Sequence, residues 1–349
     1  MRSLMRWDNL RIDGEQAARL PGYQDGAVVR TFDAPEALDT RFYEVNARSA
    51  LNRVPERSRM PFRWTINPYR GCTHACLYCF ARPTHTYLDF NAGRDFEREI
   101  VVKVNVPELV RAELRRPSWK REHVALGTNT DPYQWVEGRY GLTRGVWEAM
   151  RDFSNPCSVL TKSPLLLRDV ALFRELVERT EFVANLSVPT LDEGAWRASE
   201  PHTPHPRKRL EAAAELVRNG IPVGILIAPL MPGINDSPEQ VERILELAAE
   251  AGVSRIGGIA LHLRGELRGL FFDWLRQYRP DLVPRYEELY RRGAYVSKGE
   301  RERLASLARP DGRDPAPARR LLSPRRERER DVERAPADSH PPHEQPSLF

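Results

Sequence analysis

The sequence predicts an α/β protein in which parallel strands alternate with helices. Short runs of β-branched and apolar residues recur after residue 60, amphipathic segments separate them, and the run at 222–229 is almost wholly apolar. Strands without polar alternation are expected where helices cover both faces of a sheet. About six such β–α alternations indicate parallel strands joined by right-handed crossovers. Periodicity alone fits a doubly wound sheet and a barrel equally well.

The elements follow one another from residue 62 onward. The first 60 residues show little sustained periodicity, and we expect an extension that packs against the main domain. The expected strands are residues 63–66, 99–104, 123–127, 157–161, 182–188, 222–229 and 255–261. The expected helices begin at Pro107 and Pro164 and near residue 236, and otherwise span 142–153, 207–219, 267–278 and 282–290.

Helix-boundary residues support these assignments. Ser163 followed by Pro164 supplies an N-cap and a first-turn proline. Gly220 closes the helix before it, and Asp236 stands at the start of a well-capped segment with an apolar face.

The C-terminal segment has a different composition. Of the 41 residues from 309 to 349, eight are proline, nine are arginine and eight are acidic. Such a segment buries too little apolar surface to offset its ordering entropy. We therefore expect an N-terminal extension (1–60), a core domain with C-terminal helices (61–300) and a disordered tail (301–349).

Composition indicates a cytoplasmic protein. The 349 residues carry a net charge of +5 and four cysteines, and no apolar run is long enough to span a bilayer or act as a signal peptide. Arginines at 53, 57, 59, 63 and 70 would suit a phosphate-bearing partner, although a solvated surface explains them as well.

Three of the four cysteines, Cys72, Cys76 and Cys79, form a CxxxCxxC motif. Thiolates are soft ligands for zinc or iron–sulfur clusters, and close spacing lets one loop surround one metal centre. A structural zinc site normally has four protein ligands, whereas a cluster held by three leaves one iron open.

Two other interpretations of the motif remain. His74 could complete a zinc site, although it lies inside the same short loop. A disulfide with one spare thiol would suit an oxidising compartment, which nothing else in the sequence indicates.

The motif and its Asn-Pro-Tyr-Arg-Gly lead-in at 67–71 resemble the signature of the radical S-adenosylmethionine (radical SAM) superfamily. The resemblance covers residues 62–265 and implies a partial (β/α)6 barrel of the TIM type, with the site at the strand C-termini. It also implies a [4Fe-4S] cluster on Cys72, Cys76 and Cys79, SAM on the open iron, and Tyr78 near the adenine.

The resemblance implies a reaction and a partner as well. In this superfamily a reduced cluster cleaves SAM to a 5′-deoxyadenosyl radical, which abstracts a substrate hydrogen. A one-electron reductant of the flavodoxin or ferredoxin type is the implied partner.

Polar residues after the predicted strands resemble the spore photoproduct lyase-like branch, also described as related to DNA repair photolyases. Thr130, Lys162 and Ser187 follow the second, third and fourth barrel strands, where that branch contacts SAM. Turn capping explains Thr130 and Ser187 as well, whereas Lys162 in a pocket favours an anionic ligand. Thr128 occupies the position of the lyase's hydrogen-donating cysteine, so the lyase reaction itself is not expected.

Four further residues are considered for the site. Glu200 and Arg207 could pair structurally or position substrate, and His262 after the sixth strand should face the mouth. Cys157 begins the third strand and is expected to be a buried structural residue.

Two functions follow from these patterns. The first is a radical SAM enzyme whose substrate class we hypothesise to be nucleic acid. The alternative is a zinc-stabilised nucleic-acid-binding protein without redox activity.

Overall fold

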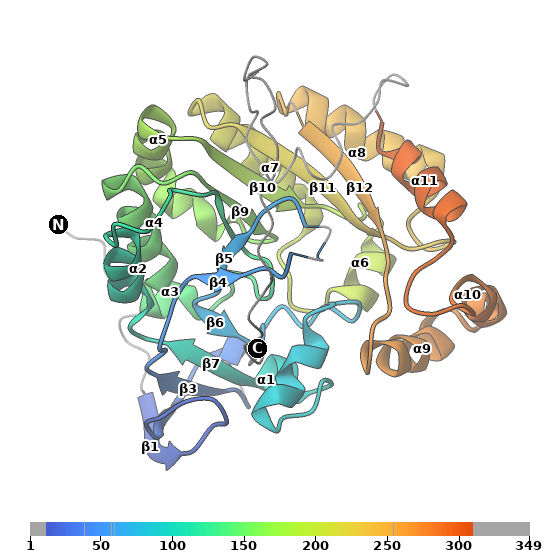
Figure 1. The fold of residues 1–349 in the computed structure, drawn as a ribbon. Helices are drawn as coiled ribbons and strands as arrows, with labels where there is room; N and C mark the ends of the chain where they lie inside the picture. The colour runs from blue at the N-terminus through green and yellow to red at the C-terminus, as the bar shows by residue number, and fades with distance from the viewer. Residues whose placement is uncertain (1–11, 38, 57, 59, 254, 310–349) are drawn as a thin grey trace, which may run out of the picture.

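Two β-sheets make up the framework of residues 12–309, the part of the chain described by this computed structural model apart from residues 38, 57, 59 and 254 (Figure 1). The larger sheet has the order β12-β11-β10-β9-β8-β5-β4. Its strands are β4 (Asn52–Arg53), β5 (Trp64–Ile66), β8 (Val124–Leu126), β9 (Cys157–Thr161), β10 (Phe182–Ser187), β11 (Val223–Leu230) and β12 (Arg255–Ala260). All pairs from β5 to β12 are parallel, and β4 adds an antiparallel edge.

The strand order decides between the two predicted topologies. A doubly wound sheet reverses its order at a switch point, whereas β5, β8, β9, β10, β11 and β12 lie in chain order. Helices line the outer side of this sheet (Figure 1): α2 (Val106–Leu114), α4 (Leu142–Asp152), α5 (Val170–Arg179), α7 (Pro206–Arg218), α8 (Pro238–Glu250) and α11 (Lys298–Leu307). Within the described residues the sheet ends at β4 and β12 without closing. The predicted partial barrel is therefore confirmed.

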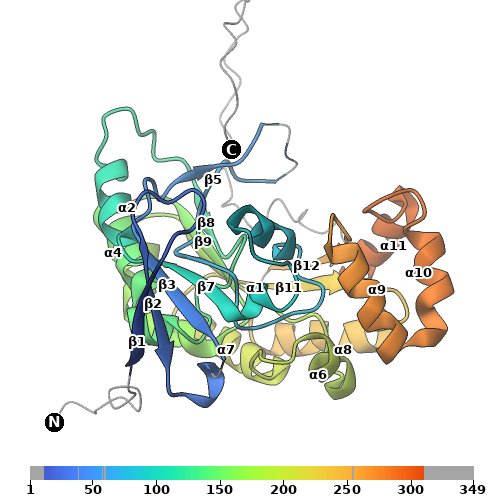
Figure 2. The same cartoon turned by 90° about the horizontal axis from the view of Figure 1, so that it is seen from below.

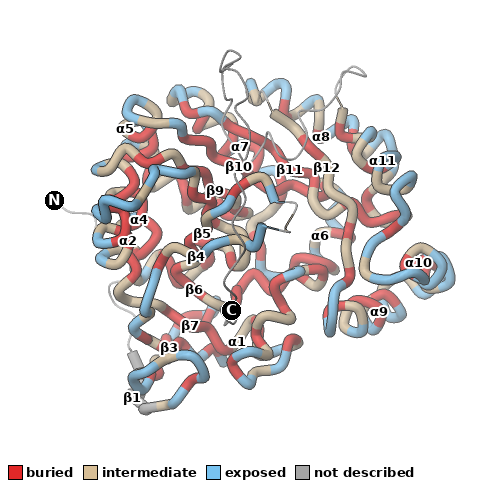
Figure 3. Tube along the Cα trace, in the orientation of Figure 1, coloured by how far each residue is buried: buried red, intermediate tan, exposed pale blue. Residues whose placement is uncertain are grey.

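The main core lies between the larger sheet and these helices. Trp147 of α4 is fully buried and meets the rings of Phe173 and Phe182 edge-on at 5.8 and 5.6 Å. Figure 3 shows the central strands buried and the outer helix faces exposed. The helix predicted from Pro164 begins as a 3-10 turn, η3 (Pro164–Asp169), capped by the Ser163 side chain, and continues as α5.

The smaller sheet joins the N-terminal extension to the barrel. Its order is β1-β2-β3-β7-β6, with strands β1 (Ile12–Ala18), β2 (Ala27–Phe32), β3 (Arg41–Val45), β6 (Tyr69–Arg70) and β7 (Glu99–Lys103). The predicted strand at 99–104 thus exists as β7, but it pairs with β3 and β6 instead of the barrel. Figure 2 shows β1, β2 and β3 on one side of the molecule and helices α9 and α10 on the other.

The C-terminal helices are α9 (Leu267–Tyr278), α10 (Val283–Leu289) and α11. Helix α11 packs on β12, where Gly258 leaves room: a Cβ there would lie 2.8 Å from Leu230 Cδ1 and 3.0 Å from Ala308 Cβ. Because α11 crosses residue 300 and buries Leu304, the predicted start of the tail at residue 301 was wrong. Residues 310–349, on which the rest of that prediction falls, lie outside the described residues.

Short elements connect the larger ones: η1 (Pro35–Ala37), η2 (Arg82–Leu88), α1 (Asp95–Arg98), α3 (Glu137–Tyr140), α6 (Glu193–Ser199) and η4 (Pro280–Leu282). In the described part of the chain, no helix combines the length and apolar character that a membrane span requires.

Candidate functional site

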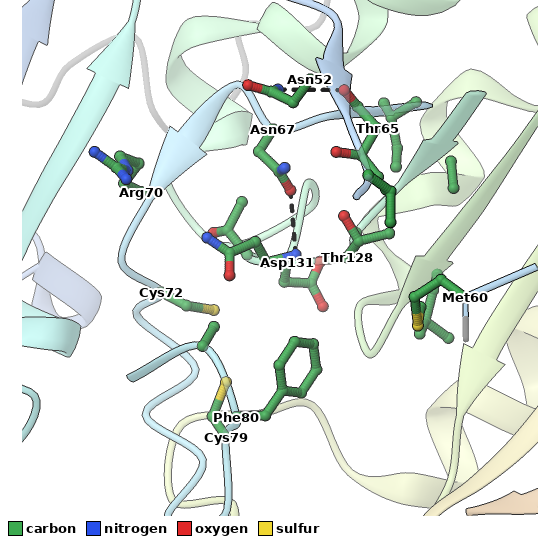
Figure 4. A pocket seen from close by; sticks show the side chains of 18 of the residues that line it. Asn52, Met60, Thr65, Asn67, Arg70, Cys72, Cys79, Phe80, Thr128 and Asp131 are labelled. Atoms are coloured by element: carbon green, nitrogen blue, oxygen red, sulfur yellow. Dashed lines mark hydrogen bonds between the residues drawn. The ribbon is translucent and has the colours of Figure 1, made fainter. Parts of the chain in front are cut away.

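A cavity of about 1790 Å³ opens at the C-terminal ends of the barrel strands. All three motif cysteines line it, together with Thr128, Lys162 and Ser187 from the strand ends. Figure 4 shows Cys72, Cys79 and Thr128 among the side chains that line it. Residues of the N-terminal extension complete the wall, so both sheets contribute to one cavity. Its place fits the rule that barrel chemistry lies on the loops after the strands.

The cysteine loop, residues 72–79, is fixed at two points by backbone hydrogen bonds. Cys72 N–H donates to Phe96 O at 2.9 Å, and Leu77 N–H donates to Ser199 O at 2.9 Å. Gly71, just before the first cysteine, has φ +79°, and a Cβ there would lie 2.8 Å from Phe96 O. The chain can therefore turn into the loop only at a glycine.

The Arg82 side chain binds the backbone of the cysteine loop. Its buried guanidinium donates to the carbonyl oxygens of Cys76 at 2.9 Å and Ala75 at 2.8 Å, and pairs with Glu97 at 2.9 Å. The same group lies 5.2 Å from the centroid of the Phe96 ring. Arg82 thus fixes the backbone between two of the three cysteines.

Thr130 and Gln134 hold the loop from the barrel side. The Thr130 hydroxyl donates to Gly71 O at 2.6 Å, and Gln134 Oε1 accepts from the Thr73 N–H at 3.0 Å. Both side chains are buried. Of the two explanations offered for Thr130, these contacts favour a structural one.

His74 meets a carboxylate, since its Nδ1 lies 3.3 Å from Asp131 Oδ2. Asp131 also accepts from the Thr161 hydroxyl at 2.6 Å and the Lys162 N–H at 2.8 Å. Within residues 12–309, as far as they are described, no three His, Cys, Asp or Glu side chains form a group suited to one metal ion.

Cys72 and Cys76 are buried, and Cys79 is half-buried. Burial raises the pKa of Cys72 well above its usual value, raises that of Cys76 to about 12 and raises that of Cys79. Without a metal they are therefore neutral near pH 7, whereas bound metal deprotonates a coordinating thiol. Three thiolates on one loop are a donor set that suits an iron–sulfur cluster, whose irons are held by cysteine sulfurs.

One buried carboxylate, that of Glu200, contacts Tyr78 and Lys162, and Lys162 in turn contacts Ser187. Lys162 Nζ lies 3.1 Å from Glu200 Oε1 and donates to Ser187 Oγ at 2.6 Å. The Tyr78 hydroxyl donates to Glu200, and Lys162 Nζ lies 5.6 Å from the Tyr78 ring centroid. Three of the four predicted SAM-contacting residues are therefore one connected group, and Thr130 stands apart from it.

Glu200 pairs with Arg209 rather than with Arg207. The Arg209 guanidinium lies 2.5 Å from Glu200 Oε2, and both side chains are fully buried. Arg207 is exposed, off the buried face of α7, so the suggested pair was wrong. Burial acts to raise the pKa of Glu200, but Arg209 and Lys162 outweigh it and bring that pKa to about 2.

A sequence comparison decides the family. The family model for the radical SAM superfamily matches residues 66–248. The chain belongs to the radical SAM superfamily. The match begins at the last residue of β5 and ends within α8, so it covers the cysteine loop and the strand ends just described.

Relatives of this radical SAM protein include uncharacterized proteins of two mycobacteria. Those of Mycobacterium tuberculosis and Mycobacterium bovis are each 46% identical over 291 residues, 83% of this chain and 86% of theirs. An uncharacterized protein of Methanocaldococcus jannaschii is 29% identical over 178 residues, 50% of this chain and 62% of its own.

Solved structures confirm the predicted likeness to spore photoproduct lyase at the level of the fold. A point mutant of that enzyme superposes with a TM-score of 0.54 at 17% identity, covering 75% of this chain and 76% of the mutant. The lyase complexed with a dinucleoside spore photoproduct gives 0.51 at 15% identity, covering 73% of this chain and 81% of the lyase.

The rim of the radical SAM cavity carries exposed apolar side chains. Among the described residues the exposed large hydrophobics are Met60, Phe80, Tyr87 and Tyr295, and all four line the cavity. His262 stacks on Tyr295 with ring centroids 5.5 Å apart and lies 5.6 Å from the Phe80 ring. As predicted, His262 faces the mouth, and Cys157 is a buried strand residue outside the cavity wall.

Proposed function

We propose that this radical SAM protein cleaves SAM reductively to a 5′-deoxyadenosyl radical, which abstracts a hydrogen atom from a substrate. Cys72, Cys76 and Cys79 would hold the [4Fe-4S] cluster, which when bound supplies the electron for this cleavage. The observation that carries the proposal is that three thiols and the polar strand ends line a single cavity. A flavodoxin- or ferredoxin-type protein would deliver the electron.

Lys162, Ser187 and Tyr78 are the residues we propose for SAM. The Lys162 ammonium has three donor hydrogens, of which Ser187 Oγ and Glu200 Oε1 occupy two. The third can bind a carboxylate of SAM. Thr130 already donates its hydroxyl proton to Gly71, so its part in SAM binding would be to position the cysteine loop.

A nucleic-acid substrate is supported by the cavity's charge and rim. Six lining residues are lysine or arginine and one is acidic, and the exposed side chains at the rim are mostly aromatic. Cationic surfaces with exposed aromatic rings bind single-stranded nucleic acid through phosphates and base stacking. Thr128, at the position of the lyase's hydrogen donor, lines the cavity but carries no thiol, so we do not propose the lyase reaction.

The test is anaerobic incubation of the reconstituted protein with SAM and dithionite. We expect 5′-deoxyadenosine, and a brown protein with about four irons and four sulfides per chain. Cys76→Ala should remove both the colour and the product. One zinc per chain without sulfide would instead support the zinc-stabilised binding protein and refute the proposal.

A further inference from the structure

Two cations lie side by side on one face of the smaller sheet, next to the cysteine loop. Arg70 pairs with Val101 in the antiparallel ladder, so Arg70 and Lys103 are diagonal neighbours across β6 and β7. Residues at such positions share a face and lie about 7–8 Å apart. Because like charges in this arrangement repel each other, the pair costs stability unless something offsets it.

Neither cation has a carboxylate partner within the described residues. Lys103 Nζ donates to one carbonyl oxygen, that of Asn67, at 3.0 Å, which leaves two of its three donor hydrogens for another acceptor. The Arg70 guanidinium contacts the Tyr23 hydroxyl. The acid on the same face of β7, Glu99, is bound to Arg41 and to the Tyr43 hydroxyl.

The pKa of Lys103 reflects both its burial and its cationic neighbour. Burial, with a further contribution from Arg70, lowers the pKa of Lys103 to about 7. His85 is under the same influence, because Arg70 adds to the effect of burial in lowering its pKa. Arg70 therefore acts as a positive charge on both Lys103 and His85.

The pair also opens into the functional cavity. Arg70, Lys103 and Tyr23 line it, and so does Arg48 from the loop after β3. Arg70 and Cys72 are two residues apart on the same stretch of chain, one on β6 and the other in the cysteine loop (Figure 4). A ligand at the pair would consequently lie in the same cavity as the three thiols.

We propose that Arg70 and Lys103, with Tyr23 beside them, form a subsite for a phosphate group of the substrate. A phosphate has enough acceptor oxygens to take the forked guanidinium and the free ammonium donors together. This inference deepens the proposed function and rests on it for the premise that the cavity receives the substrate. The phosphate can belong to a nucleic-acid backbone or to a small phosphomonoester.

The experiment measures binding to the full chain, reconstituted anaerobically and kept without reductant. The probes are a labelled single-stranded oligonucleotide, a nucleoside 5′-monophosphate and inorganic phosphate. Lys103→Met and Arg70→Gln should weaken binding roughly tenfold or more, because each removes charge-assisted hydrogen bonds. With the oligonucleotide, the slope of log affinity against log salt should fall by about 0.7 for each lost contact.

The control removes one positive charge elsewhere. Arg207→Gln changes an exposed residue outside the cavity and matches the charge lost in each test variant. Melting temperatures show whether each variant folds, and Lys103→Met should keep or raise the wild-type value because it relieves the repulsion.

The binding results for the three probes decide whether the proposed phosphate subsite exists. Loss of binding for all three probes identifies a general phosphate subsite, and loss for the oligonucleotide alone identifies a backbone phosphodiester. The proposal is overturned if both test variants bind every probe as Arg207→Gln does, or if the wild type binds none. Because no SAM is cleaved in this assay, its failure is distinct from a failure to form 5′-deoxyadenosine.

Discussion

Lys162, directly after β9, and Glu200, at the C-terminal end of α6, are joined by a 3.1 Å contact between Nζ and Oε1. The carboxylate is shared with Arg209 at 2.5 Å, so one buried negative charge faces two positive charges. The excess positive charge lies on the side of Lys162, which lines the cavity. An anionic group of a ligand would neutralise the remaining positive charge of Lys162. The first two predictions follow from this arrangement.

Replacing Glu200 with glutamine should destabilise the protein by about 3–5 kcal/mol, since it leaves Arg209 buried without its counter-charge. The measurement is urea-induced unfolding. Glu211→Gln is the matched control, because its 2.7 Å pair with Lys208 is exposed and should contribute less than about 1 kcal/mol. Equal losses of unfolding free energy for the two substitutions would contradict the conclusion that Glu200 is the counter-charge of the buried Arg209.

Replacing Lys162 with methionine should reduce SAM binding with a smaller loss of stability. Glu200 keeps Arg209 and the Tyr78 hydroxyl, so no buried charge is left unpaired. Loss of one charge-assisted hydrogen bond to a ligand corresponds to roughly tenfold weaker binding or more. Equilibrium dialysis with SAM measures this, and unchanged affinity would remove Lys162 from the SAM site.

Arg82→Lys should lower the iron content that reconstitution achieves. Arg82 bonds the Ala75 and Cys76 carbonyl oxygens and Glu97 at once, and a lysine cannot reproduce that planar fork. Iron and sulfide per chain are the readout, with the folded fraction measured by circular dichroism. Arg94→Lys is the control, since Arg94 is exposed and its contact with Asp39 is 3.8 Å long. Full iron loading of the Arg82 variant would refute a positioning role.

The barrel was predictable because its pattern is local. Each strand is a short apolar run, and each helix begins or ends at a signal such as Ser163 before Pro164. The smaller sheet was not predictable in the same way. Strands β1, β2 and β3 pair in chain order, but β3 pairs next with the distant β7. Because β7 lies inside the crossover between β5 and β8, periodicity does not reveal that partner.

The residues of the site likewise fall into those that a local sequence pattern reveals and those that only folding brings together. The cysteine spacing and the strand-end residues are sequence patterns, so Lys162 and Ser187 could be named in advance. Arg82, Gln134 and Arg209 act through contacts with residues brought near by folding. In the sequence each is an ordinary polar residue. Only its complete or near-complete burial in the structure identifies it as part of the site.

Acid should destabilise the protein through His85. Burial lowers its pKa in the folded protein to about 4, from 6.5, and its Nε2 lies 2.9 Å from Glu99 O. Between these values the unfolded chain binds a proton that the folded protein does not, so the stability falls as pH drops from 6.5 to about 4. The slope for one proton is about 1.4 kcal/mol per pH unit.

The variant His85→Gln keeps a side-chain donor for Glu99 O but cannot titrate. Its unfolding free energy should therefore depend less steeply on pH than that of the wild type, by one proton across this range. Above pH 6.5 the difference between the two proteins should be constant, which provides an internal control. Parallel pH dependences would show that His85 is protonated equally in both states.

The aromatic rim should contribute to binding through stacking, separately from charge. Tyr295 is exposed and stacks on His262 at 5.5 Å, and the Phe80 ring lies 5.6 Å from that of His262. If bases stack there, Tyr295→Ala and Phe80→Ala should each cost roughly 1–3 kcal/mol of affinity for a single-stranded oligonucleotide. The salt dependence should remain that of the wild type, because no phosphate contact is lost.

A matched control comes from another part of the molecule. Tyr278 is a half-buried tyrosine that stacks on Trp274 at 5.2 Å and does not line the cavity. Tyr278→Ala should leave oligonucleotide affinity unchanged. An equal loss in all three variants would indicate a general effect on folding, and no loss in any would exclude the rim as a stacking surface. A loss accompanied by a shallower salt slope would contradict stacking as the cause, because it would show that a cation–phosphate contact is lost as well.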